Sequence, residues 1–121
     1  MEIDNKQLTQ FEKEWLSNML SEDIPQYGFF VMQINHSHIT REGNGFFISI
    51  LFDVDHSISR ISTSVRVPIE MHLRKEGEVP IAFLLHVIDG YIAELEIYRA
   101  DLSDISANIL IRNYRKEVIY Y

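Results

Sequence analysis

The chain has 121 residues, the size of one domain, and its 46% hydrophobic and 24% charged residues are typical of a globular protein rather than a disordered one. It contains no cysteine and has a net charge of −7. These two properties exclude disulfides, thiolate metal sites and a cysteine nucleophile, and they disfavour nucleic-acid binding, which needs a basic face. The N-terminus is polar and no apolar run approaches the ~20 residues of a membrane helix. We therefore expect neither a signal peptide nor a membrane segment, and we predict a cytoplasmic protein.

Residues 1–22 predict the one helix of the chain. Their large apolar side chains recur every three or four positions and form a single stripe: Leu8, Phe11, Trp15, Leu16, Met19 and Leu20. Asp4 or Asn5 is expected to cap the start of the helix, and Pro25 lies beyond its end. The apolar stripe of such a helix has to be buried, and we expect it to pack against a sheet.

From Tyr27 onward the pattern favours strands, because β-branched and aromatic residues alternate with turn residues. Strands are predicted at 29–36, 46–52 and 59–73, with Pro68 placing the last of these at an edge or a bulge. Turns are predicted at 43–45 and 75–78. The tail, residues 108–121, fits a strand or a short helix equally well. The predicted fold is a single α+β domain, residues 1–121, with an N-terminal helix packed on a meandering antiparallel sheet of about five or six strands.

The strongest local signal is a hairpin at residues 80–99 around Asp89-Gly90, a pair typical of a type I′ turn. Regular pairing across a two-residue turn places Leu85 opposite Glu94 and Phe83 opposite Glu96. One face of the hairpin then mixes large apolar groups with carboxylates and Tyr98. Two interpretations remain open at this point: half-burial against the C-terminal tail, or a surface that binds a partner.

No motif predicts catalysis or metal binding. His36 and His38 share one strand face, but no spacing supplies a third ligand. The segment 53–64 begins like a calcium loop, yet it has Ile58 where glycine is needed and Ser64 where the bidentate glutamate belongs. We expect no metal, no cofactor and no enzymatic activity.

Residues 90–101, Gly-Tyr-Ile-Ala-Glu-Leu-Glu-Ile-Tyr-Arg-Ala-Asp, resemble a segment of small bacterial immunity proteins that belong to polymorphic-toxin and contact-dependent growth-inhibition systems. The resemblance implies a stoichiometric inhibitor that binds a cognate toxin in the cytosol and blocks its active site. Many such toxins are nucleases with basic clefts, which an acidic inhibitor would complement.

The first hypothesis is therefore an immunity protein whose partner is a toxin with a basic cleft. Its candidate contacts are the acidic groups and one tyrosine on and around the hairpin: Glu94, Glu96, Tyr98, Asp101 and Asp104, with Asp89, Glu76 and Glu78 at neighbouring turns. The alternative is a small enzyme or ligand-binding domain with a pocket between helix and sheet, lined by His36, His38 or His86.

Overall fold

The first helix begins with a capping box. In the computed structural model, which describes residues 1–121, α1 (Gln10–Met19) is capped by Thr9, whose hydroxyl accepts from the backbone N–H of Glu12 while the Glu12 side chain accepts from the N–H of Thr9. The predicted N-terminal helix is confirmed, although it is shorter than residues 1–22. The cap is Thr9 and neither Asp4 nor Asn5, because residues 1–9 instead run along β1 and α2.

A second helix, α2 (Tyr27–Asn35), occupies the segment predicted to be a strand at 29–36. Its buried side chains are Phe30, Val31, Gln33 and Ile34, which is the spacing of a helix that packs one side against a core. The segment is apolar almost throughout, so its composition resembled that of a buried strand.

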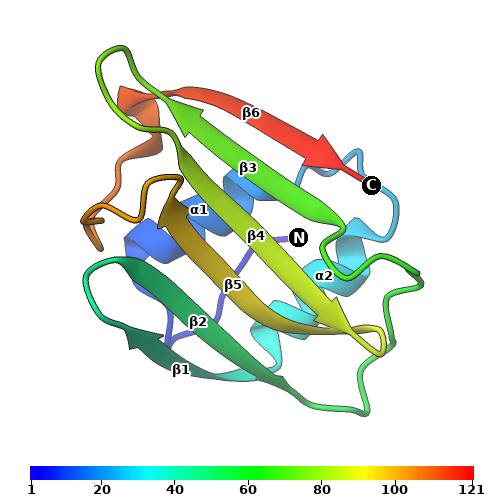
Figure 1. The fold of residues 1–121 in the computed structure, drawn as a ribbon. Coiled ribbons are helices and arrows are strands. Elements are labelled where there is room, and N and C mark those ends of the chain that lie inside the picture. Colours follow the sequence, from blue (N-terminus) through cyan, green and yellow to red (C-terminus); the bar gives the residue numbers. More distant parts are fainter.

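Six strands form one antiparallel sheet in the order β1-β2-β5-β4-β3-β6 (Figure 1). The strands are β1 (Ser37–Gly43), β2 (Phe47–Val54), β3 (Ile69–Arg74), β4 (Ile81–Ile88), β5 (Tyr91–Arg99) and β6 (Arg115–Tyr120). The α+β class and the antiparallel sheet are confirmed, as is the hairpin of β4 and β5. The strand order is not fully sequential, since β2 pairs with β5 and β6 returns to pair with β3.

Only the end of the predicted strand at 59–73 forms a strand, β3, which starts just after Pro68. Residues 57–68 form a loop, which is attached to the hairpin by the Ile61 N–H donating to Gly90 O and the Val87 N–H donating to Arg66 O. In the tail, a short 3-10 helix η1 (Ile111–Asn113) precedes β6, so the tail extends the sheet at its edge and does not cover the hairpin.

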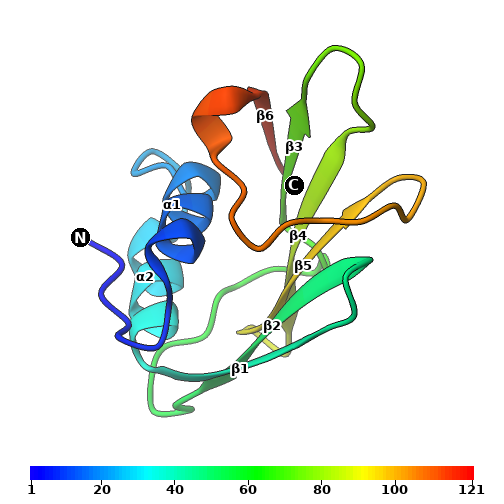
Figure 2. The same cartoon turned by 90° about the vertical axis from the view of Figure 1, so that its left-hand side faces the viewer.

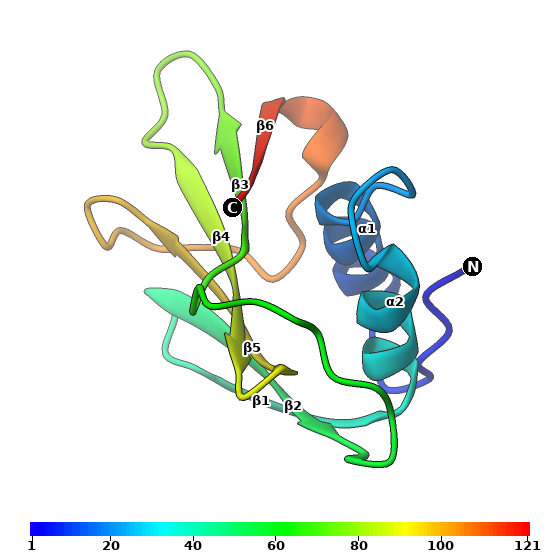
Figure 3. The same ribbon diagram turned by 90° about the vertical axis from the view of Figure 1, so that its right-hand side faces the viewer.

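Both helices lie on the same face of the sheet, which leaves two layers with the core between them (Figures 2 and 3). The core contains 25 buried apolar side chains, and Trp15 packs edge-on against Phe83 of β4 at 5.7 Å between ring centroids. The loop after β5 closes one end of the core, because Ile109 is buried and its carbonyl accepts from the Trp15 indole N–H. Neither helix is long and apolar enough to cross a membrane.

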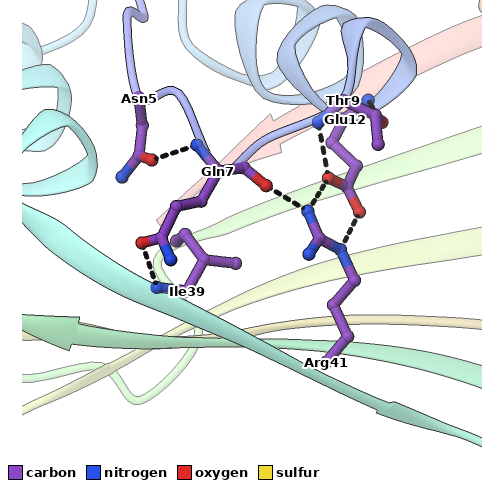
Figure 4. A network of polar contacts seen from close by, with 6 residues as sticks. All are labelled: Asn5, Gln7, Thr9, Glu12, Ile39 and Arg41. Atoms are coloured by element: carbon purple, nitrogen blue, oxygen red, sulfur yellow. Dashed lines mark hydrogen bonds and ion pairs between the residues drawn. The ribbon is translucent and has the colours of Figure 1, made fainter.

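Polar contacts tie the N-terminal segment to the edge strand β1 (Figure 4). Arg41 of β1 donates from Nε to the Glu12 carboxylate at 2.7 Å, and its terminal nitrogen reaches the same carboxylate and the Gln7 carbonyl. The Gln7 side-chain oxygen accepts from the backbone N–H of Ile39 at 3.0 Å. Asn5 is buried and donates to the carbonyls of Ile34 and Ser37. These bonds satisfy backbone groups along the outer edge of β1.

Candidate functional site

A β-bulge in β5 decides which side chains of the hairpin face the core. Ile88 pairs with Tyr91 and Val87 with Ile92, but His86 pairs with Glu94, so Ala93 is an extra residue without a partner. Asp89 and Gly90 both have positive φ, of 53° and 85°, as a type I′ turn requires. The Asp-Gly turn is therefore confirmed, and the bulge lies only three residues beyond it.

The predicted cross-strand pairing is wrong beyond the bulge. Leu85 pairs with Leu95 and Phe83 with Ile97, and all four are fully buried in the core. Glu94 and Glu96 are on the other face, because one inserted residue reverses the facing of all residues after it. Unbroken alternation would have directed Ile92, Glu94 and Glu96 to the same side. The spacing of Ile92, Leu95 and Ile97 in the sequence was the available sign of a bulge.

We call the face of the sheet opposite the helices the open face. No helix or loop lies over its centre (Figures 2 and 3). Strand register and alternating burial place the following side chains on it: Thr40, Glu42, Phe47, Ser49, Leu51, Glu70, His72, Arg74, Ala82, Leu84, His86, Glu94, Glu96, Tyr98, Arg115, Glu117 and Ile119. Its centre contains two half-buried glutamates between apolar neighbours.

Glu94 and Glu96 are held by neighbours on both sides. Ser49 of β2 is buried and its hydroxyl donates to the Glu94 carboxylate at 2.5 Å. Glu96 lies 3.0 Å from Nε2 of His86, and the exposed fractions of these side chains are 36% and 15%. The two carboxylates are therefore fixed in place while part of each remains accessible to a partner.

The tautomer of the neutral His86 ring follows from its two partners. Arg66, in the 57–68 loop, donates from Nε to Nδ1 of His86 at 3.2 Å. An arginine can only donate, so Nδ1 carries no proton and the hydrogen of the neutral ring is on Nε2, where it is donated to Glu96. On β3, Glu70 and His72 form a second carboxylate–imidazole pair at 3.1 Å.

The remaining predicted site residues are distributed over both ends of the hairpin. Tyr98 is on the open face, between Phe47 and Ala82. Asp101 and Asp104 are exposed in the loop after β5, where bonds from the Ser103 hydroxyl and N–H hold the pKa of Asp101 below its usual value. These two aspartates are therefore beside the open face at one end of the hairpin.

Glu76 and Glu78 are exposed in the β3–β4 turn, where Glu78 lies 3.7 Å from Arg99 at the end of β5. Asp89 is at the opposite end of the hairpin, about 30 Å away along a strand of this length. The structure thus brings Glu94, Glu96 and Tyr98 together on one face, with Glu76, Glu78, Asp101 and Asp104 near its end. Asp89 stands apart from this group.

Several polar residues on or beside the open face were not predicted to belong to the site, among them Ser49, Glu70 and His72 on its strands and Arg66 in the 57–68 loop. Arg66 was expected inside a regular strand, and Ser49 has no neighbour in sequence that suggests a carboxylate contact. His86 was expected in a helix–sheet pocket, but it faces away from the helices and contacts Glu96. The strand order was needed to find this cluster, and it does not follow from local sequence patterns.

The space between helices and sheet is filled by the core, and the larger hollows are at the surface. The largest, about 750 Å³, lies between residues 60–66 and residues 87–90. A hollow of about 80 Å³ lies at the edge of the layers beside Phe30, Pro68 and Tyr120, and none of the three histidines considered for a pocket lines it. His36 caps the end of α2, His38 is exposed on β1, and no three histidine or acidic side chains are arranged to hold a metal ion.

Comparison with known proteins identifies no relative of the chain. No family model, no curated protein and no solved structure matches it.

Proposed function

We propose that the chain is a cytosolic immunity protein, which neutralises a cognate bacterial toxin by binding it stoichiometrically through the open face. The observation that carries this proposal is the uncovered centre of the sheet, where Glu94 and Glu96 are flanked by Leu51, Leu84 and Tyr98. The resemblance to immunity proteins falls on β5, the strand that supplies both glutamates and the tyrosine.

The composition of the open face suits a protein interface. Interface centres combine aromatic and aliphatic anchors with a few fixed polar groups, and here Phe47, Tyr98 and Leu84 surround carboxylates that already have partners. A six-stranded sheet also presents these groups with little freedom to lose. Binding by a preorganised surface therefore costs less conformational entropy than binding by a mobile loop.

The charge of the open face specifies the kind of partner. The open face has more negative than positive side chains, and the chain as a whole is acidic. Its strands contribute five glutamates but only two arginines: Glu42, Glu70, Glu94, Glu96 and Glu117, with Arg74 and Arg115. A basic surface is the complementary partner, and the active-site cleft of a nuclease is basic because it binds phosphate. Occupation of that cleft would exclude the nucleic-acid substrate.

The test is co-purification with the toxin domain encoded beside this gene, combined with protection of cells that express the toxin. We expect a one-to-one complex and full protection. Glu96→Arg should weaken the complex at least about 30-fold, the equivalent of ~2 kcal/mol for a charge reversed within an interface.

Glu14→Arg is the matched control, because this substitution changes the net charge by the same amount. Glu14 is exposed on α1, on the side of the molecule opposite the open face. Equal loss of binding by the two variants would contradict docking through the open face. Failure of the wild-type chain to bind or protect would contradict the function itself.

A further inference from the structure

The loop between β2 and β3 differs in charge from the rest of this acidic chain. Residues 56–69 contain no aspartate or glutamate, although the whole chain has 18 acidic residues. The same segment contains Arg60 and Arg66, with the hydroxyl residues Ser62, Thr63 and Ser64 between them. A stretch with two arginines and three hydroxyl groups is suited to oxyanions, since both residue types donate hydrogen bonds.

These five side chains line the largest hollow of the molecule. The hollow has a volume of about 750 Å³, and its opposite wall is formed by residues 87–90 at the end of the hairpin. Both ends of the loop are fixed to that wall, because Ile61 N–H donates to Gly90 O and Val87 N–H donates to Arg66 O, each at 2.8 Å. The loop is thus held open between two backbone hydrogen bonds.

Each arginine is oriented by a bond from Nε alone. Arg66 donates from Nε to His86, and Arg60 donates from Nε to the Tyr91 hydroxyl at 3.3 Å while its guanidinium lies 5.4 Å from the centre of the Tyr91 ring. Neither guanidinium forms an ion pair with a carboxylate, and no protein group accepts from the terminal nitrogens of either. Their strongest donor groups for a planar or tetrahedral oxyanion therefore remain free.

One acidic group belongs to the same hollow. Asp89 is in its wall, and its charge contributes to raising the pKa of Arg60, after the larger effect of the hydrogen bond to Tyr91. Two arginines against one aspartate still leave a positive lining.

We propose that this hollow binds the phosphate group of a small molecule, with Arg60 and Arg66 as its charged donors and Ser62, Thr63 and Ser64 as neutral donors. The site is separate from the centre of the open face but is joined to it through Arg66, His86 and Glu96. It does not depend on the toxin, so its test requires only the isolated chain.

The test is a titration of the isotopically labelled protein, followed by amide NMR, with inorganic phosphate, with adenosine monophosphate and with acetate at matched ionic strength. We expect saturable shifts at residues 60–66 and 87–90 with both phosphate compounds and none with acetate. Tighter binding of the nucleotide would identify a phosphorylated metabolite as the ligand class, and equal binding would identify free phosphate.

Arg60→Gln and Arg66→Gln should each weaken phosphate binding at least tenfold. Arg115→Gln removes the same charge from an exposed arginine of β6, away from the hollow, and should leave binding unchanged. The absence of saturable shifts in the wild-type protein, or equal weakening by all three variants, would overturn the proposal. The wild-type titration decides it even if one variant does not fold. Because no toxin is present, its failure is distinct from failure of the immunity function.

Discussion

Glu12 is the only charged side chain that the fold buries, with an exposed fraction of 5%. Burial alone would raise its pKa, but hydrogen bonds from Arg41 and Thr9 outweigh that effect and hold the pKa below the ordinary value of 4.5. The same contact raises the pKa of Arg41. Glu12 therefore joins the cap of α1 to the edge strand β1 most strongly while it is ionised.

The first prediction concerns stability in acid. Since the pKa of Glu12 is lower in the folded than in the unfolded chain, its contribution is fully present above about pH 4.5 and is lost as the pH falls through the folded value. Glu12→Gln should lower the free energy of unfolding at pH 7 by about 1–3 kcal/mol, because Arg41 loses its anion. The difference from wild type should shrink below about pH 4. Urea titrations followed by fluorescence of the buried Trp15 measure both quantities, and exposed Glu14→Gln should follow wild type throughout.

The second prediction concerns Gly90, where the backbone and the space around it both require glycine. Gly90 has a φ of 85°, and an added Cβ would lie 2.8 Å from Arg60 Cβ and 2.9 Å from the Ile61 carbonyl oxygen. Gly45 has a similar φ of 89° with nothing within 4 Å. Gly45→Ala should cost about 1–2 kcal/mol from the left-handed backbone alone. Gly90→Ala should cost clearly more in the same unfolding assay, and equal costs would show that the loop gives way to the added methyl group.

At the residue scale, the sequence placed Glu94, Glu96 and Tyr98 of the candidate site on one strand but did not predict their surroundings. Glu94, Glu96 and Tyr98 do share a face, as alternation along a strand requires. Their neighbours Ser49 and Arg66 come from distant segments, and only the pairing of β2 with β5 and the attachment of the loop to β4 bring them close. Local patterns contain no information about such pairings.

At the scale of elements, the bulge in β5 reconciles two requirements of one strand. Ile92 has to be buried beside Val87, and Leu95 and Ile97 have to be buried beside Leu85 and Phe83. A regular strand cannot bury Ile92 together with Leu95, because three positions separate them. The bulge resolves the conflict, because it leaves Ala93 out of the alternation and thereby turns both glutamates away from the core.

The third prediction is that the bulged residue itself is dispensable, whereas the facing of the residues after it is not. Deletion of Ala93 places Ile92 next to Glu94, and regular alternation then still buries Ile92 and Leu95 and keeps Glu94 on the open face. An alanine inserted between Glu94 and Leu95 reverses the facing of the residues after it and should cost several kcal/mol. We expect a cooperative thermal transition from the deletion variant and an unfolded or strongly destabilised chain from the insertion variant. Equal stability of the two variants, measured by thermal denaturation, would contradict the pairing of β4 with β5.

The elements with strong local signals were predicted well, and those that depend on tertiary contacts were not. The apolar stripe predicts α1, and the Asp89-Gly90 pair predicts the hairpin turn, from residues within each element alone. The apolar segment of α2 was mistaken for a strand because composition does not distinguish a buried helix from a buried strand. Its buried Gln33 accepts from the N–H of Ile92 and donates to the carbonyls of Ser59 and Gly90, contacts that only the assembled fold explains.

At the scale of the whole molecule, two layers divide the chain into a filled core and one uncovered sheet face. The net charge of −7 attracts a basic partner from a distance, whereas Glu94 and Glu96 can interact with that partner only once it is in contact. These two roles are experimentally separable. Long-range charge governs the rate of encounter with a basic partner, and contacts govern the lifetime of the complex.

The fourth prediction follows from this separation and rests on the proposed function. Raising the salt concentration from about 0.1 M to about 1 M shortens the screening length from about 10 Å to about 3 Å. The association rate with the toxin should fall by about tenfold or more, while the dissociation rate changes little. Stopped-flow fluorescence measures both rates. An association rate that is independent of salt would contradict electrostatic steering by this chain.

The two edges of the sheet are unequal. Along β1, Gln7 occupies the N–H of Ile39 and Asn5 occupies the carbonyl of Ser37, so the first half of that edge is already hydrogen-bonded. Along β6, Tyr121 donates inward to Pro68, which leaves the backbone groups of Lys116, Val118 and Tyr120 directed outward without a partner strand. A strand that extends the sheet therefore finds more free backbone groups along β6 than along β1. Two chains that joined through β6 would leave only their β1 edges for further pairing, which favours a pair over a fibre.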